Sequence, residues 1–178
     1  MMKRPRPYDL TTHDGKRVDW LTKAALLKAE RLLGYELSIT QGSYNAGGVS
    51  QSAGTHDKGG VVDLKAWDWE NKCRALRLSG FWAWRRRPEE GDWPEHIHAA
   101  LAGNIKLAPS AFRQVEAGRA GRNGLANNGP DPHAYMVFKP FPWPYYGPVG
   151  KARWVRDQLQ GAEREAFLRR LRRVVRGK

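Results

Sequence analysis

The chain has only one cysteine, Cys73, among its 178 residues. A single thiol cannot form an internal disulfide, and it cannot supply the several thiolates that usually close a structural zinc site. Any metal ion bound by this chain must therefore be held by histidine and carboxylate side chains.

Long apolar runs are also missing from the sequence. The longest cover only a few residues, whereas a membrane-spanning helix needs roughly 20. The basic start, MMKRPRP, is followed by the polar stretch YDLTTHDGKR and not by the apolar centre of a signal peptide. We therefore expect a soluble protein that is made in the cytoplasm and shows no export signal.

Acidic residues are few compared with basic ones, at 18 Asp and Glu against 31 Lys and Arg, and the formal net charge is +13. This excess favours an anionic partner, which could be nucleic acid, a phospholipid surface or an anionic cell-wall polymer. No helix-turn-helix, zinc-finger or RNA-binding signature is visible, so nucleic acid is not expected as the partner.

Much of the positive charge lies at the C-terminus, where residues 151–178 hold ten Lys and Arg against three Asp and Glu. Phe167, Leu171 and Val175 share one helical face there, with arginines on the other. The segment predicts a basic amphipathic helix or tail that brings the protein to an anionic cell-wall polymer or membrane surface. The alternative is an ordinary helix packed on the domain.

Periodicity predicts an α+β fold with a small, mainly antiparallel sheet flanked by helices. Helices are expected at 19–33, 68–79 and about 110–117, and strands near 37–42, 61–67, 81–86 and 95–101. The first two helices should pack on the sheet. We expect one domain over residues 1–150, with its core at about 19–118, followed by a loop and a linker rich in proline and aromatics.

Three of the five histidines fall in two short segments, GTHDKGGVVDL and PEHIHAAL. His96 and His98 would share one face of a strand, while Asp63 lies in an apolar run where an unpaired carboxylate is costly to bury. Each motif alone occurs by chance, but together with His56 they indicate a metal site. Two imidazoles and one carboxylate are typical of catalytic zinc, which keeps a fourth position for water.

The same residues resemble the zinc D-alanyl-D-alanine peptidases, which include carboxypeptidases, dipeptidases and phage endolysins that cut peptidoglycan stem peptides. The family pattern is S-x-H-x-x-G-x-A-x-D, followed by E-x-x-H or H-x-H. His56, Gly59 and Asp63 stand in register with it, and Glu95 precedes His98 by three residues. The resemblance covers roughly residues 36–103 and implies a hedgehog/D-Ala-D-Ala-peptidase-like fold.

By this resemblance His56, Asp63 and His98 would bind Zn²⁺, Glu95 would be the catalytic base, and His96 would stabilise the oxyanion. Strict strand alternation sends Glu95 to the opposite face from His96 and His98, unless the chain twists just before it. Without that twist, His96 is the better base.

The sequence departs from the family pattern around the expected substrate strand. Gly54 replaces a serine, Val61 an alanine, and Tyr44 an arginine expected to bind substrate. The polar residues predicted to bind the substrate backbone are Gln41, Ser43, Tyr44 and Thr55. Without that arginine, cleavage of an internal peptide bond or of an unusual cross-link is expected as much as release of terminal D-alanine.

The resemblance implies a zinc metallopeptidase that hydrolyses peptide bonds in peptidoglycan stem peptides or cross-links. It would act at the cell wall, after phage-lysin-like release or non-standard export, and we expect a monomer. The alternative is a non-catalytic, metal-stabilised cell-wall-binding module.

Overall fold

The computed structural model describes residues 6–141, so the predicted basic segment 151–178 lies outside the described residues. The strands are β1 (Leu10–His13), β2 (Lys16–Asp19), β3 (Ile39–Gln41), β4 (Val61–Lys65), β5 (Phe81–Arg86) and β6 (His96–Leu101). The helices are α1 (Trp20–Leu33), α2 (Trp69–Leu78) and α3 (Pro109–Arg119), with short 3₁₀ turns at Ser50–Ser52 and Pro88–Glu90. The predicted α+β class is confirmed. Within the described part of the chain, no helix has the length and apolar content that a bilayer crossing needs.

A four-stranded sheet forms the centre of the described region, in the order β3-β4-β6-β5. Every neighbouring pair in it is antiparallel, which confirms the predicted mainly antiparallel sheet. Asp63 on β4 and Trp84 on β5 both pair with His98 on β6. The register therefore sets these three side chains on the same face of the sheet.

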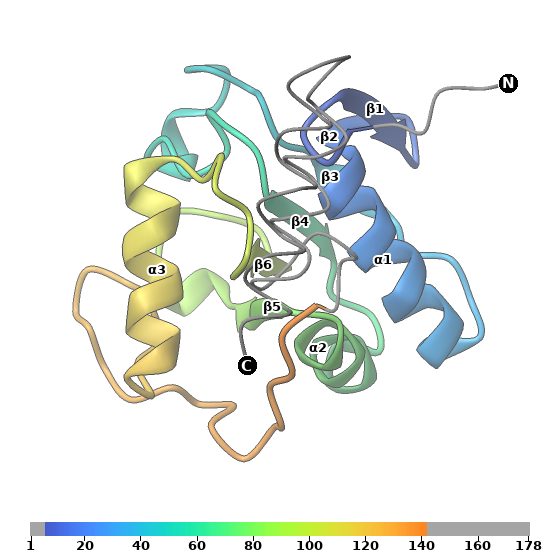
Figure 1. Ribbon diagram of the computed structural model, residues 1–178. Helices are drawn as coiled ribbons and strands as arrows, with labels where there is room; N and C mark the ends of the chain where they lie inside the picture. The colour runs from blue at the N-terminus through green and yellow to red at the C-terminus, as the bar shows by residue number, and fades with distance from the viewer. Residues whose placement is uncertain (1–5, 142–178) are drawn as a thin grey trace, which may run out of the picture. The chain divides into compact units, whose positions relative to one another are not determined.

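Helices cover the sheet from both sides, with α3 on one side and α1 and α2 on the other (Figure 1). α2 packs on β5 and β6, and α1 packs on α2. Ala111 and Val115 of α3 pack against Val61 of β4 and Ala100 of β6, at one end of this face of the sheet. Beyond this contact, the α3 face of the sheet carries polar side chains, and it is there that the candidate site lies.

Local signals position α1 as the sequence predicted. The Asp19 carboxylate accepts a hydrogen bond from the Thr22 backbone N–H at 2.8 Å, and Gly34 ends the helix in the left-handed region at φ 78°. Asp19 is fully buried and also accepts from the Tyr44 hydroxyl at 3.1 Å and the Asn104 amide at 2.7 Å. This carboxylate joins the start of α1 to two loops.

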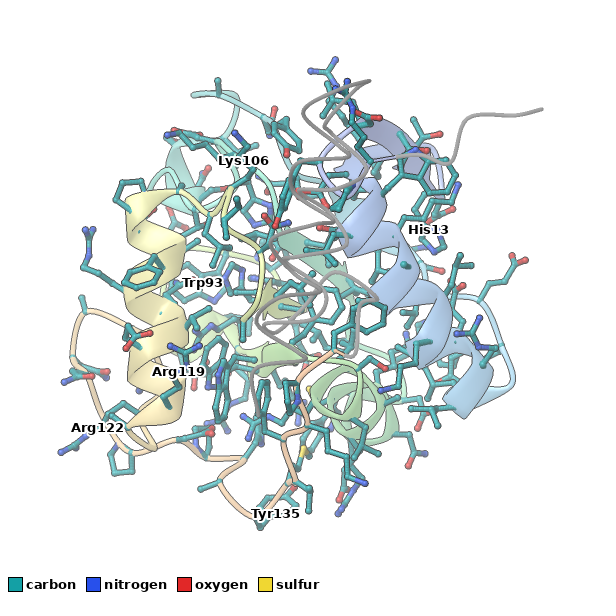
Figure 2. The ribbon with its side chains drawn as sticks, viewed as in Figure 1. His13, Trp93, Lys106, Arg119, Arg122 and Tyr135 are labelled. Carbon is teal, nitrogen blue, oxygen red and sulfur yellow. The ribbon has the colours of Figure 1, made fainter. Side chains whose placement is uncertain are left out.

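The structure adds a hairpin, β1–β2, that the sequence analysis did not predict. Asp14 and Gly15 form its turn with φ values of 47° and 69°, which suits a two-residue loop between twisted strands. His13, labelled in Figure 2, has its Nε2 2.8 Å from Glu30 Oε1 on α1. This contact holds the hairpin to the helix. The chain is therefore ordered well before residue 19.

The chain beyond α3 also packs onto the described body. Arg77 of α2 is buried and donates to Asp131 Oδ2 at 2.8 Å, to the His133 carbonyl at 2.8 Å and to the Ala83 carbonyl at 3.1 Å. Met136 is 3% exposed. The packed region thus reaches past the predicted core limit near residue 118.

Candidate metal centre

The three predicted ligands come together in the structure. His56 is presented by the loop before β4, Asp63 by β4 and His98 by β6, and one ligand atom from each lies within 4.8 Å of the others. All three side chains are buried. Gly60, with φ 85°, turns the chain between His56 and the strand, and a Cβ atom there would lie 2.9 Å from Asn104 and Leu107.

Both histidines direct one ring nitrogen at Asp63. His98 Nδ1 lies 2.8 Å from Asp63 Oδ1, and His56 Nε2 lies 3.2 Å from Asp63 Oδ2. The outer nitrogens have other partners: His56 Nδ1 donates to the Gly42 carbonyl at 2.9 Å, and His98 Nε2 lies 2.7 Å from the side-chain amide of Gln114. The Gly42 carbonyl can only accept, so the neutral His56 ring carries its proton on Nδ1 and turns the lone pair of Nε2 to Asp63. The Asp63 carboxylate also can only accept, so His98 Nδ1–H donates to it.

A lone pair that faces a carboxylate at the distance of His56 Nε2 is favourable only with a proton or a metal ion between the two atoms. The contact from His56 Nε2 to Asp63 is not aligned as a hydrogen bond, and that nitrogen is buried with no other partner among the described residues. The group can therefore hold a metal ion through two imidazole nitrogens and one carboxylate. Within residues 6–141 no other set of His, Cys, Asp and Glu is arranged in this way.

The charge states in the site suit metal binding. Burial raises the pKa of Asp63, but the two imidazoles against it outweigh burial and hold that pKa well below its ordinary value. Burial lowers the pKa of His98. At neutral pH Asp63 is therefore ionised and His98 is neutral, which are the states in which both side chains bind metals.

His96 stands beside the three ligands on the same face of β6. Its Nε2 lies 3.9 Å from Asp63 Oδ1, and its Nδ1 donates to the Pro94 carbonyl at 2.7 Å. Trp93, labelled in Figure 2, meets the His96 ring edge-on with centroids 6.3 Å apart. Because the Pro94 carbonyl can only accept, the neutral His96 ring carries its proton on Nδ1, and its Nε2 is on the side of Asp63.

Glu95 is placed differently from His96. Its carboxylate forms an ion pair with Arg85, which pairs in register with Ile97. Ile97 alternates with the two histidines of β6, so Arg85 stands on the opposite face of the sheet from them. Glu95 contributes to the cavity wall, but its carboxylate is engaged by Arg85.

A cavity of about 960 Å³ opens over the three ligands, and its wall includes the loop after β3, the segment before β6 and α3. Of the predicted substrate-binding residues, Gln41 and Thr55 line it, while Ser43 and Tyr44 do not. The Ser43 hydroxyl donates to the Val61 carbonyl at 2.7 Å, and the Tyr44 hydroxyl donates to Asp19. The structure therefore gives Ser43 and Tyr44 contacts that join parts of the fold.

Two residues on the cavity wall, Gln114 and Arg86, were not among the predicted site residues. Gln114 reaches His98 from α3, and no motif marks it because its position depends on how α3 packs. Arg86 follows Trp82 and Trp84 at every second position of β5, so strand alternation alone could have placed it on the face of His98.

Cys73 is not part of the site. It is fully buried, and burial raises the pKa of its thiol to about 12. A thiol with so high a pKa carries almost no thiolate at neutral pH, which makes this cysteine a poor nucleophile there.

The chain was compared with protein-family models, with curated proteins and with solved structures, and none of the three comparisons gives a match.

Proposed function

We propose that this protein is a zinc-dependent peptidase that hydrolyses peptide bonds in peptidoglycan stem peptides or cross-links. The observation that carries the proposal is the convergence of His56, Asp63 and His98 in a large cavity, with His96 beside them. The spacing of these residues resembles that of the zinc D-alanyl-D-alanine peptidases, which supports the choice of substrate.

The donor set favours zinc over calcium and magnesium. Two imidazole nitrogens and one carboxylate are a common protein ligand set for catalytic zinc, whereas calcium and magnesium prefer oxygen ligands. The two outer contacts, from His56 to the Gly42 carbonyl and from His98 to Gln114, orient the rings as partners of metal-bound histidines do.

A bound zinc ion would supply an acidified water molecule and polarise the carbonyl of the peptide bond. His96 is placed to accept the proton of the attacking water, because its Nε2 faces the site and the Pro94 carbonyl holds its Nδ1–H. His96 then returns this proton to the departing amine and is neutral again at the end of the cycle. Because Glu95 is paired with Arg85, His96 is the better base in this chain.

A non-catalytic wall-binding module is the second candidate, and Tyr44 is the observation that favours it. This residue stands where the family pattern has an arginine, and its hydroxyl is held by Asp19, away from the cavity. A protein that retains one zinc ion per chain but leaves peptidoglycan intact would support this candidate.

Mass spectrometry of peptidoglycan fragments tests the proposal and identifies the bond. Purified peptidoglycan is incubated with the full chain after chelation and again after zinc is restored. We expect new fragments with one added water at a peptide bond, only in the zinc-loaded sample and not with the His98→Ala variant. Intact stem peptides in the presence of bound zinc would refute the peptidase proposal.

A further inference from the structure

Arg86 is a buried cation on the wall of the cavity that holds the metal centre. It is 3% exposed, and burial lowers its pKa to about 10, so that it stays protonated at neutral pH. Its Nη2 donates to the Asn123 carbonyl at 2.8 Å, and its guanidinium lies over the Trp84 ring at 5.0 Å from the centroid. The charges of Glu90, Asp63 and Asp131 act on Arg86, but among residues 6–141 none of these carboxylates forms an ion pair with it, and Asp131 and Glu90 pair with Arg77 and Arg87.

Arg77 is a second buried arginine of the described chain, and its hydrogen bonds can be compared with those of Arg86. Its guanidinium is paired with Asp131 and also donates to the carbonyls of Ala83 and His133. Arg86 has the same five N–H donors but one hydrogen bond within the described chain. Burial of a charge with so few hydrogen bonds is costly, and an anion bound to the unused N–H donors of Arg86 would reduce that cost.

Arg86 lies on the wall of the cavity that contains the candidate active site. Arg86 pairs in register with His96, and Trp84, two residues earlier, pairs with His98. Arg86 therefore stands on the same face of the sheet as the histidines, and it lines the same cavity. A planar guanidinium can bind a carboxylate through two parallel hydrogen bonds.

We propose that Arg86 binds a carboxylate group of the substrate next to the bond that is cut. The inference rests on the proposed peptidase function for the identity of the ligand, since a stem peptide carries carboxylates and no phosphate. The carboxylate is either the C-terminus of the peptide, which makes the enzyme an exopeptidase, or an acidic side chain beside an internal bond.

Calorimetric titration of the full chain with soluble stem peptides separates these two sources. Three peptides are used: one unmodified, one with an amidated C-terminus and one with amidated side-chain carboxylates. We expect one of the amidations to weaken binding by about tenfold to a hundredfold, the range for a lost charge-assisted hydrogen bond. Equal binding of all three peptides, or binding of none, would overturn the proposal.

The variant Arg86→Gln should bind the unmodified peptide as weakly as the native chain binds the discriminating amide, and should no longer distinguish the two. Arg119→Gln is the matched control, because Arg119 is exposed and does not line the cavity. If Arg86→Gln fails to fold, Arg86→Lys keeps the charge without the planar fork and should lose most of the discrimination. If either variant still distinguished the unmodified peptide from the amidated one as the native chain does, another residue would bind the carboxylate.

Binding and cleavage are read separately, so the two proposals can fail separately. Carboxylate discrimination that depends on Arg86, without hydrolysis of the peptide, would keep the anion site and reject the peptidase. Hydrolysis without discrimination would keep the peptidase and reject the role of Arg86.

Discussion

Asp63 and His98 are register partners on neighbouring strands, and their side chains meet with His98 Nδ1 2.8 Å from Asp63 Oδ1. The hydrogen-bond ladder between β4 and β6 thus fixes the spacing of two of the three candidate ligands. The third, His56, is added by a loop that the Gly42 carbonyl orients. Two of the three candidate ligands are therefore positioned by backbone pairing, and the following predictions test the parts of the candidate metal site.

Replacement of His98 by alanine should abolish stoichiometric zinc binding, because only His56 and Asp63 would remain of the three ligands. Zinc per chain is measured by elemental mass spectrometry after dialysis against zinc and then against buffer. His13→Gln is the control, since His13 contacts Glu30 on α1 and should keep the native zinc content. A His98→Ala chain that still binds one zinc ion would place the metal elsewhere.

His96→Ala should keep the metal and lose most of the hydrolytic rate, by about a hundredfold or more, since it removes the proposed proton acceptor. Glu95→Gln should retain a rate near that of the native chain, because its carboxylate is engaged by Arg85. Initial rates on a stem peptide at saturating zinc separate the two variants. The reverse result, an inactive Glu95→Gln and an active His96→Ala, would return the role of base to Glu95.

Gln114→Leu should weaken zinc affinity by about ten- to a hundredfold, because it removes the hydrogen-bonding partner that orients the His98 ring. Competition with a coloured chelator measures the dissociation constant. Gln51→Leu changes another glutamine of the cavity wall that has no contact with a ligand, and it should leave the affinity unchanged. Equal affinities in both variants would show that α3 does not support the site.

Asp19→Ala should lower the free energy of unfolding by about 3 kcal/mol. The variant loses the N-cap of α1 at Thr22 and leaves the buried polar groups of Tyr44 and Asn104 without their acceptor. Urea denaturation gives the value. Asp9→Ala removes an exposed ion pair and should cost less than about 1 kcal/mol, so similar losses in the two variants would contradict this account.

The stability of the metal-free chain should fall as the pH drops below about 6.5, and His133 contributes to this loss. Burial and the nearby Arg77 charge lower the pKa of His133 in the folded state. Between its folded and unfolded pKa values the unfolded chain binds more protons, so stability decreases as the pH falls, by up to about 1.4 kcal/mol per pH unit. Urea denaturation at pH 7.5 and about 5.5, with a chelator present, should show a smaller loss for His133→Gln than for the native chain.

Much of the fold could be predicted from local signals in the sequence. The N-cap at Asp19 and the glycine at position 34 mark the ends of α1 within the helix itself. The alternation of side chains along β6 predicts His96 and His98 on one face of the sheet and Glu95 on the other. The ion pair of Glu95 with Arg85 agrees with this prediction. In each case the deciding interaction lies within a few residues along the chain.

Other features depend on contacts between distant segments and could not be predicted in the same way. Tyr44 is predicted to bind substrate because it stands where the family pattern has an arginine, but its φ of 58° and its hydrogen bond to Asp19 hold its hydroxyl at the start of α1. Gln114 reaches His98 only because α3 packs on Val61 and Ala100. The β1–β2 hairpin did have a local signal, the Asp-Gly turn, although its strands are short and polar.

The pairing of Asp63 with His98 also makes a metal ion at the candidate site, if one binds there, sensitive to the register of the sheet. A slip of one residue between β4 and β6 would turn these two side chains to opposite faces, so a misregistered molecule cannot assemble the site. Metal present during refolding would then draw molecules by mass action toward the one pairing that binds it. The ratio of bound metal to protein in a refolded sample would count the molecules with correct pairing, which a helix-sensitive spectroscopic signal does not do.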